Sequence, residues 1–469
     1  MKSVDDILAI ESIEDKISEL KRKDVDVPSW KELVKEYDPM QHEIMTDTTT
    51  RKDKVFKDGS IEKAARVTYG QQRMFARRMT QMSFSIPVKR EYDTHDEESE
   101  QIATALESIY KKARIDSMNM NRMHAYFASC EVLTIWYAVE SPNNDYGFES
   151  KFKLRNRSYS PMDKKFSRIE QADIYPLFTD GDLVSMSFSY RKKAKDVSVK
   201  YFETYTDKKH IVWEEVDGAW AEKTNEDIVI LKIPGVYIWR PMPIHEDTTN
   251  NTREIEYTMS RQSDILRRNS APVLAVEGKF AGKDTAGDSA REVYRLESGG
   301  KVSYVTWQQQ IEAMKFYISE LKRNTEEELQ LPNLSLENVK GLGAVSGEAR
   351  KTLLTDAHLK VGYESGEILE FLDRECNVIK AFLELMNVKW KGKTSAVGVE
   401  HTITPFVQND EMNEIEKIMR VTGGEAVASR KTGIKALGWV AADKVDEETK
   451  AIENEQSAKY APSIFEPTE

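Results

Sequence analysis

The sequence predicts an α+β fold in which a helical and β-rich body is joined through a long helix to a helical C-terminal part. Three observations predict it. Apolar and polar residues alternate with the period of a β-strand between residues 184 and 213. Two segments, 251–270 and 306–331, instead carry apolar residues at helical spacing and enclose a short β segment. Helical spacing then recurs from Ser346 to about Asn387, which predicts one long helix.

Residues 1–60 are rich in charged side chains, with a possible helix over 4–21 and a polar stretch over 46–50. We expect them to form a loosely packed N-terminal arm. Residues 61–125 are expected to be mostly helical, because apolar residues recur on one helical face. The residues of that face are Ile102, Leu106, Ile109 and Ala113.

A β-meander is predicted downstream of the helical region. An apolar strand covers 132–139, and three further runs alternate in polarity. Turns at 191–195 and 217–218 would join these runs as hairpins. The alternating apolar residues are Val184, Met186, Phe188, Tyr190, Val197, Val199, Tyr201, Ile211 and Trp213.

The two segments 251–270 and 306–331 are predicted to be helices that pair with one another. Their apolar positions suffice for one helix contact but leave broad polar faces, so we expect a neighbouring copy of the chain to complete the packing. The packing positions are Ile255, Met259, Leu266, Ile311, Met314, Ile318 and Leu321.

Residues 271–305 are predicted to form short strands separated by glycine-containing turns. Short strands are marginal alone, so we expect them to pair with strands of an adjacent copy and to present a rim to a partner. The residues that define this segment are Val276, Gly278, Tyr294, Gly299, Gly300 and Tyr304.

The long helix is preceded by a glycine-rich loop over 332–347. Ser346 can cap the first free N–H groups of the helix, and Glu348 sits at the positive end of the helix dipole. A helix from Ser346 to Asn387 would span roughly 60 Å. Gly362 and Gly366 in its middle predict a bend or a close helix contact.

Candidate catalytic and metal-binding motifs are weak throughout the chain. No histidines pair at helical spacing or join a Cys-x-x-Cys, and the glycine loop at 341–347 follows no strand. The Thr-Asp-Gly-Asp run at 179–182 suits a turn better than half of a metal loop. The basic run 191–195 could touch nucleic acid, although a solvated hairpin tip is favoured. We expect no catalytic residues, metal or cofactor.

Composition sets further bounds. The chain has 469 residues and a formal net charge of −12, which argues against phosphate contacts over its whole surface. Cys130 and Cys376 are far apart in segments expected to be buried, so a reducing compartment is favoured over a disulfide scaffold. The sequence shows neither a signal pattern nor an apolar run of membrane-spanning length, which favours a protein that is soluble and not secreted.

Several of these segments together resemble the portal proteins of tailed bacteriophages, of the type found in siphophages. The resemblance rests on the stretch 296–305, the helix with Ile311, Ile318 and Leu321, the run 331–335, and the helix start at 346–349. It continues through a strand at 400–406 and through runs at 409–411, 428–432, 437–440 and 443–455. The segments 67–70, 84–88 and 132–139 lie where the family has its first wing elements.

The resemblance implies the organisation of a portal subunit. It assigns 61–250 and 348–407 to a wing, the helices 251–270 and 306–331 to a stem, and 271–305 to a clip. It makes 332–347 a tunnel loop and 408–469 a helical crown, while 1–60 match nothing in the family. The tunnel loop would place Lys340, Gly341, Leu342 and Gly343 at the DNA channel.

The family also implies a function and a set of partners. About twelve subunits would form a ring at one capsid vertex, through which double-stranded DNA is packaged and ejected. Expected partners are the large terminase, a head-completion adaptor and the major capsid or scaffolding protein, without a membrane. The protein would be assembled in the host cytoplasm and reside in the virion, and it would not be an enzyme. A different capsid-associated structural or adaptor protein, without a DNA channel, is the main alternative.

Overall fold

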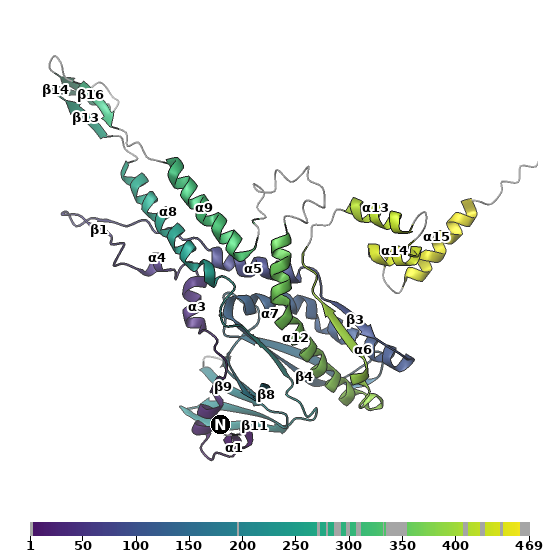
Figure 1. The fold of residues 1–469 in the computed structure, drawn as a ribbon. Coiled ribbons are helices and arrows are strands. Elements are labelled where there is room, and N and C mark those ends of the chain that lie inside the picture. The colour runs from purple at the N-terminus through teal and green to yellow at the C-terminus, as the bar shows by residue number, and fades with distance from the viewer. Residues whose placement is uncertain are drawn as a thin grey trace, which may run out of the picture. The chain divides into compact units, whose positions relative to one another are not determined.

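The computed structural model describes residues 3–194, 197–269, 273–277, 280–285, 292–296, 301–305, 311–331, 333, 354–406, 411–422, 427–440 and 444–459 (Figure 1). The chain divides into two compact units. The larger comprises Met1–Pro332 and Asp356–Phe406, and the smaller comprises Asn333–Thr355 and Val407–Glu469. The α+β class predicted from the sequence is confirmed, because helices and antiparallel sheets occupy separate stretches of the chain.

Four helices form near the N-terminus, where a loosely packed arm was predicted. They are α1 (Val4–Leu8), α2 (Ile13–Leu20), α3 (Trp30–Tyr37) and α4 (Glu43–Thr46). The side chains of Ser3 and Ser12 cap the first two. The prediction of a loose arm was wrong, because apolar side chains at helical spacing are buried here despite the surrounding charge. Ile7, Ile17 and Leu20 share a core cluster with Leu177, Phe202, Ile211 and Trp213.

Three longer helices follow a small hairpin of β1 (Lys54–Val55) and β2 (Ile61–Glu62). They are α5 (Gln71–Phe84), α6 (Glu97–Ala113) and α7 (Ile115–Ser129). The predicted apolar face of α6 is confirmed, since Ile102, Leu106 and Ile109 are buried. The strand β3 (Lys89–Asp93) lies between α5 and α6.

The predicted β-meander is confirmed as a five-stranded antiparallel sheet of order β11-β10-β9-β8-β7. Its turns carry left-handed backbone: φ is +53° at Asp180 and +90° at Gly181, and +50° at Asp217 and +86° at Gly218. The Thr-Asp-Gly-Asp run is therefore a hairpin turn. Strand β8 continues to Ala194, so residues 191–194 are strand rather than the turn predicted there. The strands are β7 (Asp173–Thr179), β8 (Asp182–Ala194), β9 (Val197–Tyr205), β10 (Lys209–Val216) and β11 (Ala219–Asp227).

A second sheet of order β12-β4-β5-β6 packs against the first. Its strands are β4 (Glu131–Asn143), β5 (Ser150–Ser160), β6 (Glu170–Gln171) and β12 (Gly235–Trp239). Strand β4 confirms the strand predicted over 132–139. The apolar cluster that joins the sheets contains Leu133 and Tyr159 from the second and Met186 and Phe188 from the first.

The long helix α12 (Thr355–Met386) crosses the larger unit. Leu354 lies in a turn, so the helix begins later than the predicted Ser346, while residues 346–353 lie outside the described residues. Its 32 residues span about 48 Å. A side chain added at Gly362 or Gly366 would meet nothing within 4 Å, so neither glycine serves a close contact between described residues.

Helix α12 is tied to the rest of its unit by a buried ion pair. The guanidinium of Arg122 on α7 donates two hydrogen bonds of 2.7 Å to the carboxylate of Glu375, and the indole N–H of Trp136 on β4 donates a third of 2.9 Å. Beyond the helix come the 3-10 turns η3 (Val388–Trp390) and η4 (Thr394–Ala396). Strand β17 (Gly398–Thr402) then pairs with β3; it is shorter than the strand predicted over 400–406.

Among the described residues between β12 and α12 are two long helices and four short strands. The helices are α8 (Thr249–Asn269), which follows the 3-10 turn η1 (Glu246–Thr248), and α9 (Ile311–Leu329), and they confirm the helices predicted over 251–270 and 306–331. The strands are β13 (Val273–Glu277), β14 (Phe280–Thr285), β15 (Glu292–Leu296) and β16 (Lys301–Val305).

The smaller unit contains three helices among its described residues: α13 (Glu411–Thr422), α14 (Arg430–Leu437) and α15 (Val445–Lys459). Ser429 caps α14 with its hydroxyl, which accepts from the N–H of Thr432 at 3.2 Å. A side chain at Gly433 would approach Thr422 on α13 within 2.8 Å, so the absence of a Cβ permits this close helix contact. The helical character predicted for 408–469 is confirmed over these residues.

Candidate functional site

Helices α8 and α9 lie side by side and run in opposite directions (Figure 1). Two polar contacts join them at different heights. The side-chain amide of Asn251 donates to the carboxylate of Glu328 at 3.0 Å, and the hydroxyl of Tyr317 donates to Glu254 at 3.3 Å. The short strands β13 to β16 lie between α8 and α9 in the sequence. The contacts that hold this helix pair to the rest of the larger unit therefore also anchor these strands.

One side of α8 forms a polar ladder, by which we mean Thr252, Glu256, Ser260 and Asp264. The extended residues 65–71 run along it in the opposite direction. Backbone N–H groups of this segment donate to Asp264 at 2.7 Å, to Ser260 at 2.8 Å and to Glu256 at 2.5 Å; the donors are Ala65, Val67 and Tyr69. Thr252 adds a contact to the Gln71 side chain at 3.4 Å.

The polar ladder can form because the spacing of alternate residues in an extended segment nearly equals the spacing of every fourth residue along a helix. Two residues of extended chain advance about 6.6 Å, and four residues of an α-helix advance about 6.0 Å. Every second N–H of the segment therefore meets every fourth side chain of α8. In this way a segment without a strand partner satisfies its backbone donors and fixes α8 along about three helical turns.

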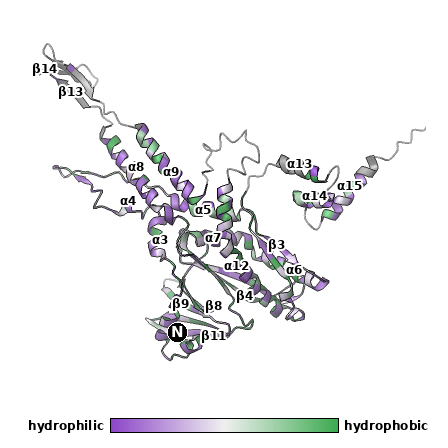
Figure 2. Cartoon of the chain, viewed as in Figure 1, coloured by the Kyte–Doolittle hydropathy of each residue, from purple (hydrophilic) through white to green (hydrophobic). Residues whose placement is uncertain are grey.

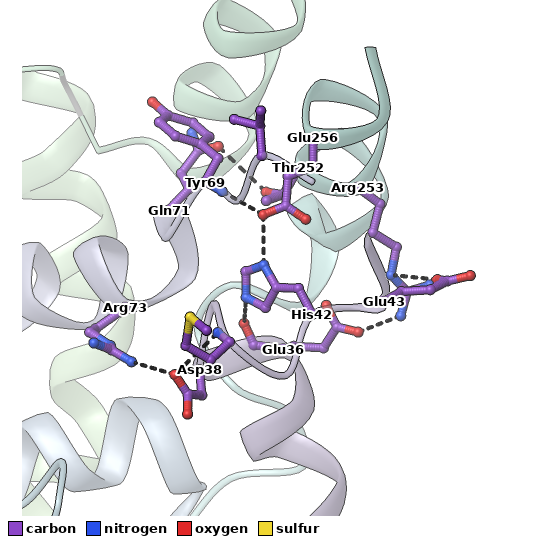
Figure 3. Close-up of polar contacts among 12 residues, drawn as sticks. Glu36, Asp38, His42, Glu43, Tyr69, Gln71, Arg73, Thr252, Arg253 and Glu256 are labelled. Atoms are coloured by element: carbon purple, nitrogen blue, oxygen red, sulfur yellow. Dashed lines mark hydrogen bonds and ion pairs between the residues drawn. The ribbon is translucent and has the colours of Figure 1, made fainter. Parts of the chain in front are cut away.

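The deepest ladder residue, Glu256, pairs with a buried histidine from the N-terminal region (Figure 3). The Nδ1 of His42 lies 2.7 Å from the Glu256 carboxylate, and its Nε2 lies 2.7 Å from the carbonyl oxygen of Glu36. Both partners are acceptors, so both ring nitrogens donate and the imidazole is cationic. Burial lowers the pKa of His42, but the bonds to Glu256 and to the Glu36 carbonyl outweigh it and raise that pKa.

Charged side chains surround this ion pair and extend the attachment (Figure 3). Arg253 on α8 pairs with Glu36 at 2.5 Å, and Arg73 on α5 pairs with Asp38 at 3.2 Å. Farther along α8, Arg51 contacts the ladder carboxylate of Asp264. A small cavity of about 230 Å³ lies beside these groups. Its lining mixes both signs of charge, which suits a structural contact better than a ligand site.

The residues predicted to pack the stem are only partly buried. Ile255 is fully buried, whereas Met259, Met314, Ile318 and Leu321 are half-buried. Leu266 is 53% exposed, and Ile311 begins α9 with its side chain outside the described residues. The sequence analysis missed three large exposed side chains, Tyr257, Phe316 and Tyr317, of which Phe316 is 65% exposed. Figure 2 shows hydrophobic and hydrophilic residues interspersed along both helices.

The strands carried by the helix pair form ladders within the chain. Strand β13 pairs with β16, with Val276 opposite Val302 and Leu274 opposite Tyr304, and β14 pairs with β15, with Tyr294 opposite Lys283. These strands therefore have partners in the same chain, although the sequence analysis expected partners in a neighbouring copy. Gly278, Gly299 and Gly300 lie outside the described residues, as do the four residues predicted at the channel, Lys340, Gly341, Leu342 and Gly343.

Among the residues that the structure describes, no cluster of His, Cys, Asp or Glu could hold a metal ion. Both cysteines are buried and free, and burial raises the pKa of Cys130 to about 12, so its thiol is unreactive at neutral pH. None of the described helices is long and apolar enough to cross a membrane.

Comparison with known proteins identifies one family. A family model described as phage portal protein, SPP1 Gp6-like, matches residues 19–460. The chain is also similar to a solved structure titled the neck of a native GTA particle computed with C12 symmetry, at 13% identity over 79% of this chain and 90% of that chain, with a TM-score of 0.40. For the neck of an empty GTA particle computed with C6 symmetry, the identity is 11% over 86% and 94%, with a TM-score of 0.41. No curated protein matches the chain.

Proposed function

Because the chain belongs to the SPP1 Gp6-like family of phage portal proteins, we propose that copies of it form a closed ring at one vertex of a phage capsid. Double-stranded DNA enters and leaves through the channel of this ring. The family is a structural one.

One observation supports the ring most directly. The pair α8–α9 is held to the body by the polar ladder, yet it leaves Tyr257, Leu266, Phe316 and Tyr317 exposed. Complete burial of a fully exposed side chain of this kind contributes roughly 1.5–3 kcal/mol, and burial of these partly exposed ones contributes about half as much. A ring covers the same surface on every subunit, so adjacent copies that pack α8 against α9 would bury these side chains around the whole circle. We therefore assign residues 251–270 and 306–331 to the stem of the portal.

The remaining parts follow from the family. We assign 61–250 and 348–407 to the wing, 271–305 to the clip, 332–347 to the tunnel loop and 408–469 to the crown. The clip presents its strand edges to the large terminase and then to the head-completion adaptor, while the major capsid or scaffolding protein surrounds the ring. Lys340 in the tunnel loop guides the DNA backbone through a ring whose subunits each carry a formal net charge of −12 over their whole length.

The ring is tested by measuring the mass of the purified full chain by light scattering and imaging it in negative stain. We expect a ring of about twelve subunits with an axial channel, assembled in the cytoplasm and then built into the virion. A species that stays monomeric at all concentrations, or an oligomer without a channel, would contradict the proposal. Such a result would favour a capsid-associated adaptor without a DNA channel.

A further inference from the structure

A basic cleft lies where the ends of the two sheets of the larger unit meet. Its volume is about 820 Å³. Six basic side chains line it against two acidic ones, Glu170 and Asp173, which gives a balance of +4 in a chain whose net charge is −12. We call this site the basic cleft; its cations are Arg157, Lys164, Arg191, Lys192, Lys193 and Lys200.

The strand pairing concentrates like charges in the basic cleft. Arg191 on β8 stands directly opposite Lys200 on β9, and Lys193 follows two positions later on the same face of β8 as Arg191. Like charges at directly opposed positions of a ladder are destabilising. A hairpin selected only for stability would place an acidic residue at one of these positions. The arrangement therefore keeps positive potential at the cleft at some cost to the fold.

These cations are also largely unneutralised. Lys164 pairs with Glu170 at 2.6 Å, and the charge of Lys192 acts on the buried carboxylate of Glu203, but Arg191, Lys193 and Lys200 make no ion pair within 4 Å with another described residue. Lys192 instead lies 4.9 Å from the centre of the Tyr190 ring, and Lys200 lies 5.4 Å from that of Trp220. The carboxylate behind them, Glu203, is engaged by the Tyr190 hydroxyl and by His210 at 3.5 Å.

We propose that the basic cleft binds an extended acidic peptide segment of a partner protein. The walls are strands, and the apolar faces of Tyr159 and Tyr190 line the same space, so carboxylates can meet the cations while the chain between them packs on the rings. An extended chain that alternates apolar and acidic side chains would match both the rings and the cations of this lining. This binding does not require the ring.

The test measures the affinity of the full chain for a short labelled oligoglutamate peptide by fluorescence anisotropy. The cleft variant is Arg191→Glu/Lys193→Glu, whose two side chains are exposed. The matched control is Lys151→Glu/Lys391→Glu, which reverses two exposed charges outside the cleft. We expect the cleft variant to weaken binding by roughly tenfold at low salt and the control to leave it nearly unchanged. A labelled single strand and a labelled duplex of DNA are measured in parallel.

The folding of the variants is checked by thermal unfolding. The cleft variant should unfold no earlier than the wild type, because Glu at 191 would face Lys200 and replace a repulsion by an attraction. Peptide binding that is lost only in this folded variant supports the proposal. Absence of peptide binding, or equal binding by both variants, overturns it. Tighter binding of either DNA than of the peptide, lost in the cleft variant, also overturns it and assigns the cleft to nucleic acid.

Discussion

His42 and Glu256 are 214 positions apart in the sequence and meet as a buried ion pair at the base of α8. Burying two charges costs desolvation free energy. The mutual attraction of the pair offsets part of this cost, and so do the hydrogen bonds that His42 makes to the Glu36 carbonyl and that Glu256 accepts from the Tyr69 N–H. The spacing of the histidines along the chain predicted no site for His42. Nothing in the neighbourhood of His42 along the chain indicates its partner, because that partner lies on a different element.

Replacing Glu256 by Gln should be strongly destabilising. The amide preserves the shape but leaves the His42 cation buried without its counter-ion, a loss of about 3–5 kcal/mol. Thermal and urea unfolding of Glu256→Gln measure this effect. The matched control is Arg261→Gln, which removes a charge at an exposed position on the same helix and should change the stability by about 0.5 kcal/mol or less. Equal stability of the two variants would contradict the ion pair.

Two other histidines make the stability depend on pH. Burial, with Arg77 and Arg73 nearby, lowers the pKa of His124 to about 4, and burial also lowers the pKa of His245 to about 3. The unfolded chain takes up protons at these residues below about pH 6.5, and the folded chain does not. The contribution of these two histidines to the stability of the fold is therefore present above about pH 6.5 and is lost as the pH falls from there toward 4. His42, with its raised pKa, behaves oppositely: its contribution is complete below about pH 6.5 and is lost as the pH rises through that raised pKa.

His124→Gln should reduce the acid sensitivity. Glutamine can still accept the hydrogen bond from the Tyr37 hydroxyl, which His124 contacts at 2.9 Å, but it takes up no proton when the chain unfolds. The free energy of unfolding of the wild type should fall more steeply than that of the variant, by up to about 1.4 kcal/mol per pH unit, between about pH 6.5 and pH 5. Urea unfolding across this range measures the slopes. Equal slopes of the two proteins would contradict the lowered pKa of His124 in the folded chain.

At the scale of elements, the polar ladder shows how a helix can hold a segment that has no strand partner. Half of the ladder could be read from the sequence, since Thr252, Glu256, Ser260 and Asp264 recur every four residues along α8. The other half could not. Residues 65–71 carry no periodic signal, because their backbone and not their side chains makes most of the contacts.

Ser260→Ala should release the middle of this segment. The change removes the acceptor for the Val67 N–H, and a backbone donor left unsatisfied costs about 1–3 kcal/mol. Hydrogen exchange should accelerate at the amides of residues 65–69 before any change appears in the two sheets. Ser263→Ala provides the control, since the described contacts of α8 to this segment do not include Ser263. Unchanged exchange in Ser260→Ala would show that the ladder does not hold the segment.

At the scale of the whole molecule, patterns of short range were predictable and contacts of long range were not. Helical spacing and alternation predicted α8, α9, most of α12 and the meander, because both periods are local properties of the backbone. The packing of α1 and α2 escaped prediction, since Ile7 and Leu20 become core residues only when Phe202 and Trp213 are brought to them by the sheet. The proposed contact between copies of the chain was equally hard to predict. Its only signal is that apolar side chains such as Phe316 stay exposed in the single chain.

The exposed side chains of α9 give the sharpest test of the ring. Phe316→Asp/Tyr317→Asp should abolish the ring, because each interface of the circle would lose the burial of the exposed parts of two aromatic side chains, roughly 1.5–3 kcal/mol in all, and would gain unpaired charge. Light scattering measures the mass, and circular dichroism checks that the sheets remain folded. The matched control is Lys315→Asp/Ser319→Asp, two exposed polar positions on the same helix. Rings of wild-type mass from the aromatic variant would contradict the assignment of α8 and α9 to the stem, whereas loss of the ring in both variants would trace the effect to charge alone.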